Sequence, residues 1–205
     1  SAVQGETITV NATVANVGNA SGSTTAEFGF ANATLLTQTV TLDSGNATDL
    51  SFDVPTGNVT PGTYIHGVRA GESLQTAEIT IQQPATFEVS DLQAPATAVA
   101  GETVTVNATI TNVGGVAGST LVEFVFDGSA LLNQSITLGP EESTDVRFQV
   151  PTDGIPSGTY EHGVGAGESF QAAEIVIQQP ATFEVSDLGA PGSAVQGETI
   201  TVNAT

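Results

Sequence analysis

Eight asparagines occur in the pattern Asn-x-Ser/Thr, which is the acceptor sequence for N-linked glycans. Three of them, Asn11, Asn107 and Asn203, hold the same position in successive copies of a repeated unit. We expect some of the eight to carry glycans. The alternative is that Asn and Thr are simply frequent on the exposed face of a chain without lysine. The candidate acceptors are Asn11, Asn19, Asn32, Asn46, Asn58, Asn107, Asn133 and Asn203.

The two histidines, His66 and His162, each stand in a Tyr-x-His-Gly segment. One imidazole per repeated unit cannot complete a metal site without further ligands, which favours a structural role for both. The chain has no Cys, and no Ser stands in a recognisable nucleophile elbow. We therefore expect no catalytic residues, no enzyme activity and no bound cofactor.

Carboxylates are the remaining candidates, because calcium prefers oxygen ligands. Glu141, Glu142 and Asp145 share one expected loop, while Glu88 and Asp91 stand beside the junction between units. However, the chain has no Asp-x-Asp-x-Asp-Gly loop, and the Glu-Glu pair becomes Ser-Gly in the preceding unit. Solvated carboxylates are favoured, so we predict no metal ligands and keep a calcium site as the alternative.

The charge balance is strongly acidic. The chain has 22 Asp and Glu, only Arg69 and Arg147 as cations, and a formal net charge of −20. Such a surface repels nucleic acid and anionic membranes, which excludes both as partners of this segment. Molar salt shortens the Debye length to about 3 Å and screens the self-repulsion. We therefore expect a protein that works in brine, in preference to a merely acidic secreted protein.

Self-similarity at fixed spacing dominates the sequence. Residues 1–13 recur letter for letter as residues 193–205, and residues 82–92 recur as residues 178–188, which is 96 positions later. Such periods indicate proteins built from stacked copies of one unit. The expected units are residues 1–84, a repeat without its first strand; residues 85–180, a complete repeat; and residues 181–205, the first strands of a third.

Within the complete unit the hydrophobic period is two. Residues 103–110 read Thr-Val-Thr-Val-Asn-Ala-Thr-Ile, so their apolar side chains share one face and Asn107 points to solvent. Similar short runs alternate with Gly and Pro turns, and this pattern is typical of immunoglobulin-like or fibronectin-like sandwiches. We predict an all-β chain of tandem seven-stranded sandwiches arranged end to end. The expected strands are residues 87–92, 103–110, 121–126, 132–138, 144–150, 159–164 and 169–177.

The complete unit resembles the cell-adhesion-related repeat called CARDB, which is abundant in surface proteins of salt-loving archaea. The most specific part is the progression Gly-Glu-x-x-x-Val-x-Ala-x-x-x-Asn-x-Gly, which spans residues 101–114 and recurs at residues 5–18. The resemblance implies an extracellular sandwich module that serves as a spacer or adhesive segment. It supplies no catalytic motif.

Tyr64 and Tyr160 occupy the same register in the two units. Each suits a tyrosine corner, in which the hydroxyl bonds back to the backbone, although a simple core tyrosine is the alternative. The chain has no initiator Met, no signal peptide and no apolar run that could span a bilayer. We expect the elements that target or anchor it to lie outside these residues.

These observations predict a non-enzymatic, extracellular structural protein that forms a cell-surface stalk or filament on a halophilic archaeon. The alternatives are a spacer attached to a secreted enzyme or solute-binding domain, or a calcium-dependent adhesion module. The expected partners are copies of the same chain or neighbouring repeats. The tail carries a spare copy of the strand that the first unit lacks, which permits strand addition between subunits. Because residues 193–205 duplicate residues 1–13, a continuous polypeptide is favoured.

Overall fold

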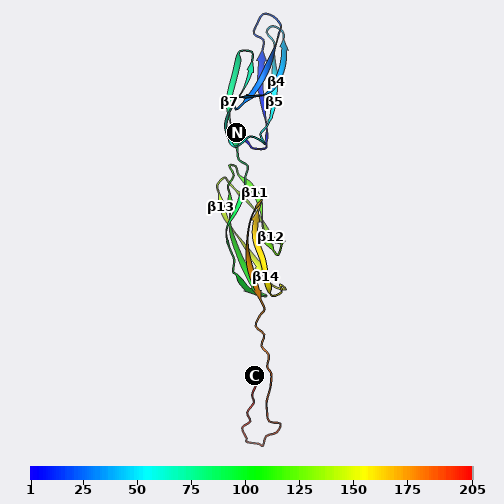
Figure 1. Cartoon of the computed structure of the whole chain (residues 1–205), viewed down its shortest axis with the longest axis vertical. Helices are drawn as coiled ribbons and strands as arrows, with labels where there is room; N and C mark the ends of the chain where they lie inside the picture. Colours follow the sequence, from blue (N-terminus) through cyan, green and yellow to red (C-terminus); the bar gives the residue numbers. More distant parts are fainter. Residues whose placement is uncertain (205) are drawn as a thin grey trace.

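The computed structural model describes residues 1–204, and these residues form two β-sandwiches followed by an extended tail (Figure 1). The predicted all-β sandwich fold is confirmed, because fifteen strands and no helix are found in the described residues. It follows that no helix within residues 1–204 could cross a membrane. In Figure 1 the two sandwiches lie one after the other along the longest axis, with the tail beyond the second.

The first sandwich consists of a five-stranded sheet in the order β1-β7-β6-β3-β4 and a two-stranded sheet, β2-β5. All of its pairs are antiparallel except β1 with β7. Its strands are β1 (Ala2–Val3), β2 (Thr7–Ala15), β3 (Gly22–Phe30), β4 (Ala33–Leu42), β5 (Ala47–Pro55), β6 (Gly62–Ala70) and β7 (Ser73–Gln82).

The second sandwich has the same topology with one additional strand. Its five-stranded sheet has the order β12-β11-β14-β15-β9, and its second sheet has three strands in the order β13-β10-β8. The bounds are β8 (Phe87–Gln93), β9 (Thr97–Val99), β10 (Thr103–Asn112), β11 (Gly118–Phe126), β12 (Ser129–Leu138), β13 (Ser143–Pro151), β14 (Gly158–Ala166) and β15 (Ser169–Gln178).

The second sandwich has eight strands, one more than the seven expected. The strand that the sequence did not predict is β9, which is three residues long and pairs in parallel with β15, as β1 does with β7. The strand that the first sandwich lacks is β8, which pairs with β10 in the opposite sheet. Pro95 stands between β8 and β9 and has no N–H for a ladder. The first segment of the unit therefore crosses from one sheet to the other, and its second half is too short for a period-two pattern to be recognised.

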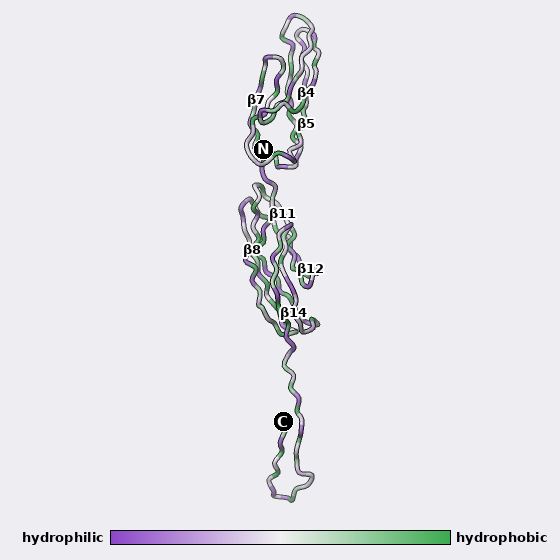
Figure 2. The backbone as a smooth tube through the Cα atoms, viewed as in Figure 1, coloured by the Kyte–Doolittle hydropathy of each residue, from purple (hydrophilic) through white to green (hydrophobic). Residues whose placement is uncertain are grey.

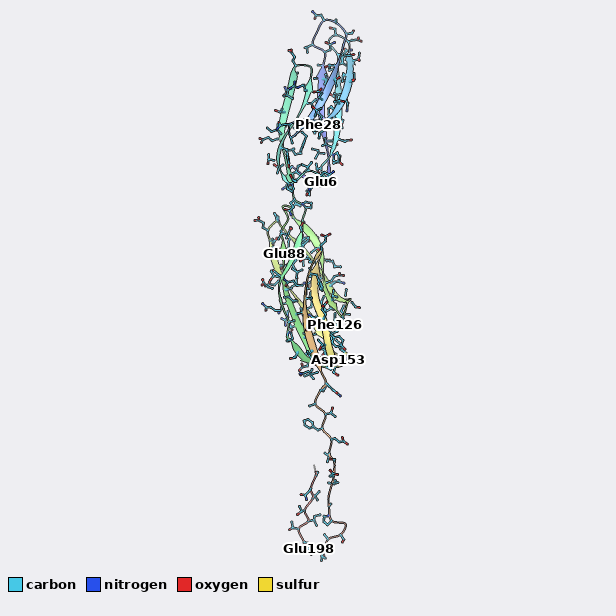
Figure 3. The ribbon with its side chains drawn as sticks, viewed as in Figure 1. Glu6, Phe28, Glu88, Phe126, Asp153 and Glu198 are labelled. Carbon is cyan, nitrogen blue, oxygen red and sulfur yellow. The ribbon has the colours of Figure 1, made fainter. Side chains whose placement is uncertain are left out.

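Alternating side chains from both sheets fill each core, as the period-two pattern predicted. Val104, Val106, Ala108 and Ile110 of β10 are all buried in the second sandwich. Figure 3 labels Phe28, which lies between the two sheets of the first sandwich and stacks on Phe52 at 5.7 Å between ring centroids. The two sandwiches have separate hydrophobic cores.

The Gly-Glu part of the repeated motif closes a tight turn. Gly101 has a φ of 93°, which favours glycine, and the Glu102 carboxylate accepts a hydrogen bond from the Val99 N–H at 2.9 Å. The buried Thr152 hydroxyl donates to the Glu102 carbonyl at 2.8 Å and accepts from the Gly101 N–H at 3.0 Å. This part of the motif is therefore explained by the turn that it closes.

Both tyrosines form the expected corners. The Tyr64 hydroxyl donates to the Thr60 carbonyl at 2.7 Å, and the Tyr160 hydroxyl donates to the Pro156 carbonyl at 3.1 Å. Each ring also packs against a phenylalanine, Phe30 in the first sandwich and Phe126 in the second. These bonds fix the approach of the chain to β6 and β14.

The tail, residues 181–204, contains no strand ladder in the described residues. Its single β-bridge joins Gly189 and Asn203, and every residue in it is exposed. Figure 2 shows hydrophobic stretches along this tail, well away from either sandwich. The same residue types form β8 in the second sandwich, where β10 offers a neighbouring strand.

Candidate functional site: a groove on the first sandwich

A sheet edge is left open on the first sandwich. In the second sandwich β10 lies between β13 and β8. In the described residues, the equivalent strand β2 pairs with β5 alone. The backbone groups on the other edge of β2 therefore face a position where a further strand fits.

This open edge borders a groove of about 390 Å³. The groove reaches from β2 across the space between the sheets to β3 and β7, and its lining is mainly apolar with a few hydroxyl and amide groups. Because both walls belong to the sandwich core, the groove is an opening into that core. Its lining includes Val14, Gly18, Gly22, Leu42, Ser73 and Gln75.

The groove leaves the first core less well covered than the second. Val68 is 9% exposed, whereas its equivalent Val164 is 0% exposed. Beside the open edge, Val17 is 94% exposed, against 43% for Val113. Apolar area that remains in water contributes nothing to the hydrophobic free energy of folding. We infer that the first sandwich is the less stable of the two.

An asparagine that both units share marks the end of the groove. Asn16 is half-buried and its side chain bonds Ala20, Leu42 and Gly18. Its equivalent Asn112 is 0% exposed, and its Oδ1 also accepts a hydrogen bond from the Thr86 N–H of the incoming chain at 3.2 Å. The Asn16 Oδ1 thus occupies the position at which, in the second sandwich, the Asn112 Oδ1 holds the segment before β8.

The predicted glycan acceptors lie at the surface of the chain. Asn107 points away from the core, as its strand parity predicted, but β8 flanks it and leaves it half-buried between Gln93 and Arg147. The third residue of the last acceptor sequence, Thr205, lies outside the described residues. The other seven asparagines are exposed: Asn11, Asn19, Asn32, Asn46, Asn58, Asn133 and Asn203.

His162 lies in the apolar core of the second sandwich. It is 2% exposed, and its ring is 5.9 Å from that of Phe124. Neither ring nitrogen has a hydrogen-bond partner within residues 1–204. Burial lowers the pKa of His162 below its usual 6.5, so the neutral form is favoured in the folded chain. This environment fits the structural role expected of both histidines.

Replacing His162 with leucine is expected to stabilise the second sandwich, and more so at pH 5 than at pH 8. The folded pKa lies below that of the unfolded chain, so the unfolded state binds the proton first as the pH falls below about 6.5. The replacement also removes two unpaired buried nitrogens, which is worth about 1 kcal/mol or more.

The measurement is the difference in free energy of unfolding between wild type and His162→Leu at each pH and fixed salt. His66→Leu is the matched control, because His66 occupies the same register but is half-buried. An equal gain at both pH values would contradict the assignment.

Two of the five carboxylates considered for calcium are engaged in local hydrogen bonds. Glu142 accepts from the Gly139 N–H at 2.7 Å, and Asp145 accepts from the Thr109 hydroxyl at 2.8 Å. Within residues 1–204 no group of three or more His, Asp or Glu is placed to hold a metal ion. None of the 22 carboxylate residues is buried, and only Glu27 and Glu123 are half-buried.

The packing role of two glycines of the groove was not predicted from the sequence, although Gly18 ends the repeated motif. Gly18 and Gly22 hold the registers of Gly114 and Gly118, on which the chain entering the second sandwich packs. The signal was present in the sequence as two glycine pairs 96 residues apart. It is easily overlooked because glycine near a strand end is usually interpreted as part of a turn.

Solved structures of a CARDB domain are similar to part of this chain. A crystal structure of a CARDB domain from Pyrococcus furiosus, described as a complex with di-metal ions, is 19% identical and has a TM-score of 0.41. The match covers 46% of this chain and 89% of that one. A solution structure of the same domain is 20% identical with a TM-score of 0.38, and the match covers 45% and 95% of the two chains.

A β-glucosidase from Listeria innocua is 16% identical, with a TM-score of 0.44. The match covers 52% of this chain but 18% of that enzyme. No curated protein matches the chain. The family comparison is more specific: residues 84–175 match the CARDB family model, and the second sandwich is thus similar to CARDB domains, which are adhesion-related immunoglobulin-like modules.

Proposed function

We propose that the chain is a non-enzymatic structural protein of the cell exterior, and that its sandwich repeats build a stalk or filament on the surface of a halophilic archaeon. The observation that carries the proposal is the repetition itself. Two sandwiches of matching topology follow one another, and the segment that joins them, residues 82–92, is present again after the second sandwich. A chain of this kind provides length and a repeated surface.

The connector between the sandwiches supports an extended, semi-rigid arrangement. β7 ends at Gln82 and β8 begins at Phe87, so few residues separate the two folds. Within them, the Val113 N–H donates to the Thr86 carbonyl at 2.7 Å and the Gly115 N–H donates to the Gln83 carbonyl at 3.1 Å. A connector held by bonds to the next sandwich has little freedom to bend.

The surface chemistry supports an extracellular location in brine. Exposed carboxylates on β5 and β13 accept hydrogen bonds from threonines on the neighbouring strands β2 and β10, as Asp49 does from Thr13 and Asp53 from Thr9. The exposed faces of these strand pairs thus stay acidic and hydrated without lysine. Exposed acceptor asparagines fit a glycosylated cell-surface protein.

We expect native protein to lose mass on enzymatic or chemical deglycosylation, by an amount that corresponds to glycans on some of the eight acceptor sites. Intact-mass spectrometry before and after treatment measures this loss, and peptide mapping assigns it. Asn11 and Asn107 form an informative pair, because they share a register and differ in exposure. A native mass equal to that of the unmodified polypeptide would contradict glycosylation.

The structural role is tested by electron microscopy of the native assembly at a resolution that traces the backbone. The expected image is a filament or stalk of consecutive sandwiches on the cell surface. A spacer would instead lead into a pocketed enzyme or solute-binding domain after few repeats, which the same images distinguish. Thermal melts with calcium and with chelator at fixed high salt test the adhesion-module alternative, which an unchanged midpoint would exclude.

A further inference from the structure

We propose that copies of this chain pack side by side, with the five-stranded sheet of the first sandwich of one copy lying on that of the second sandwich of another. The inference rests on the proposed structural role and names its lateral partner, a second copy of this chain. The two contact surfaces are the outer sides of these sheets: the first face, on β7, β6 and β3, and the second face, on β15, β14 and β11. They differ at positions that point away from the cores, and the differences are complementary.

Both faces expose large apolar side chains. On the first face Ile65 and Leu74 are 58% and 49% exposed. On the second face Leu121 and Val176 are exposed, and so is Phe170, whose exposed fraction is 48%. None of the five belongs to a hydrophobic core or packs against one. Apolar side chains that gather on a surface with a polar rim mark sites of contact with other proteins.

The two faces differ in shape. On the first face Gly29 and Gly67 are directly opposite on β3 and β6, and they line a hollow of about 250 Å³. On the second face Val125 holds the register of Gly29, opposite Gly163. The Phe170 ring lies against Gly163, where a Cβ atom would collide with it. The first face is thus hollowed where the second face protrudes.

Charge distinguishes the faces further. Arg69 is one of only two cations in the chain and is exposed on β6, where the second sandwich has Gly165. Conversely, the second face has Glu161 where the first has Ile65. Glu161 is directly opposite Glu174 on β15, and both are exposed. Like charges in this position destabilise a sheet, and a cation from outside relieves their repulsion.

The other charges of the two faces favour unlike faces as partners. Glu27 and Glu78 lie on the first face with Arg69, so that face carries charges of both signs. The second face has Glu123 in addition to its opposed pair and no cation, because Arg147 lies on β13 in the other sheet. Two second faces therefore repel each other, whereas the first face offers the second one a positive charge.

Spacing along the strands brings the complementary features together in one orientation. Ile65 and Arg69 are four residues apart on β6, as are Glu161 and Gly165 on β14, which is about 13 Å in each strand. When β6 lies over β14 in the antiparallel sense, Arg69 lies over Glu161. Ile65 then lies over Gly165, beside Phe170, which is opposite Gly165 on β15. Sheets that pack face to face in this way are about 10 Å apart.

The partner is a second copy because the two faces cannot meet within one copy. Figure 1 shows the sandwiches one after the other along the longest axis, and the short connector between them is hydrogen-bonded to the second sandwich. A cationic protein would fit Glu161 and Glu174 but would repel Arg69. One contact between two small faces is weak, and a chain of repeats strengthens it because further contacts form between tethered partners.

The apolar contact is tested by sedimentation analysis of the 205-residue chain at fixed molar salt, at concentrations up to about 1 mM. Phe170→Asp should weaken self-association by about 10-fold or more, because it places a charge in an apolar contact. Leu74→Asp should do the same from the first face, which guards against a folding defect of the second sandwich. Val17→Asp, at an exposed site after β2, should leave association unchanged. A monomeric wild type, or equal association of the three variants, would overturn the proposal.

The charge contact is tested by a charge exchange. Arg69→Glu should weaken association by about 10-fold, because it sets like charges against each other. Arg147→Glu makes the same change in net charge on the other sheet and should have no effect. Glu161→Arg added to the Arg69→Glu chain restores opposite charges and should recover most of the association. A double variant that associates no better than Arg69→Glu alone would overturn the proposal.

Orientation is tested with paired cysteines and a short bismaleimide, since the chain has no cysteine of its own. Ile65→Cys with Phe170→Cys should give intermolecular cross-links. Ile65→Cys with Val176→Cys should not, because Val176 lies six residues further along β15, about 20 Å away. Cross-links confined to single chains, or equal intermolecular yields for both pairs, would overturn the proposal.

Electron microscopy of the native assembly separates this inference from the structural role. Filaments that run side by side, with the five-stranded sheets of neighbouring chains facing each other, are the expected result. Filaments that lie singly, without contact between sandwiches of different chains, would overturn the lateral contact and leave the structural role intact. Side-by-side association in solution with no filament or stalk on cells would do the reverse.

Discussion

Replacing Asn112 with alanine is expected to lower the free energy of unfolding of the second sandwich by about 3–5 kcal/mol. The Asn112 side chain donates to the carbonyls of Val116, Leu138 and Gly139 at 2.9, 3.2 and 3.0 Å. Its Oδ1 accepts from the Gly114 N–H at 3.0 Å, besides Thr86. Alanine would leave these backbone groups buried without partners.

Tyrosine fluorescence measures this effect, because each sandwich contains one tyrosine. In a Tyr64→Phe background, Tyr160 reports unfolding of the second sandwich alone. Asn16→Ala is the matched variant in the first sandwich, read with Tyr160→Phe, and should cost less because Asn16 is half-buried. Asn133→Ala, on the exposed face of β12, should change stability by less than about 0.5 kcal/mol. A similar small effect at Asn112 would contradict the role.

Transfer from molar chloride salt to dilute buffer is expected to lower the melting midpoint by roughly 10 °C or more. The net charge of −20 is then screened over about 10 Å instead of about 3 Å. Some repulsion is local, since Glu161 and Glu174 are directly opposite on β14 and β15, where like charges destabilise a sheet. A loss of about 2 kcal/mol per sandwich gives a shift of this size.

The charge variants separate local repulsion from general salt effects. Glu161→Gln should reduce the loss on dilution, whereas Glu168→Gln, in the turn between β14 and β15, makes the same charge change away from Glu174 and should do less. Sodium and potassium chloride at equal ionic strength should act alike if screening is responsible. A midpoint that does not move on dilution would contradict adaptation to brine.

Sequence periodicity predicted the sheets well where one face is buried. β10 is the clearest case, since Val104 to Ile110 alternate strictly and the structure buries every second residue. β9 could not be predicted, because three residues are fewer than a period-two pattern needs. The environment of His162 was also beyond the sequence: its isolation depends on how β14 faces Phe124 across the core.

The candidate groove was partly predictable. Counting strands showed that the first unit lacks a partner for β2, and repetition showed where a spare copy lies. The sequence could not show that Ser73 and Gln75 line the groove. Their equivalents Ser169 and Gln171 bond to β8 because β8 crosses from one sheet toward the other, which only the structure shows. Likewise, the close packing at Gly114 and Gly118, whose registers Gly18 and Gly22 hold, is apparent only from the structure.

The parallel pairing of β9 with β15 has a mechanical consequence. Thr97, Ala98 and Val99 pair with Val176, Ile177 and Gln178, next to the points where the chain enters and leaves the second sandwich. Because the two strands run in the same direction, a pull on the chain ends slides one along the other. The ladder bonds are then stretched together instead of opening one at a time. The parallel pair is therefore expected to resist tension along the strands better than a hairpin pair would.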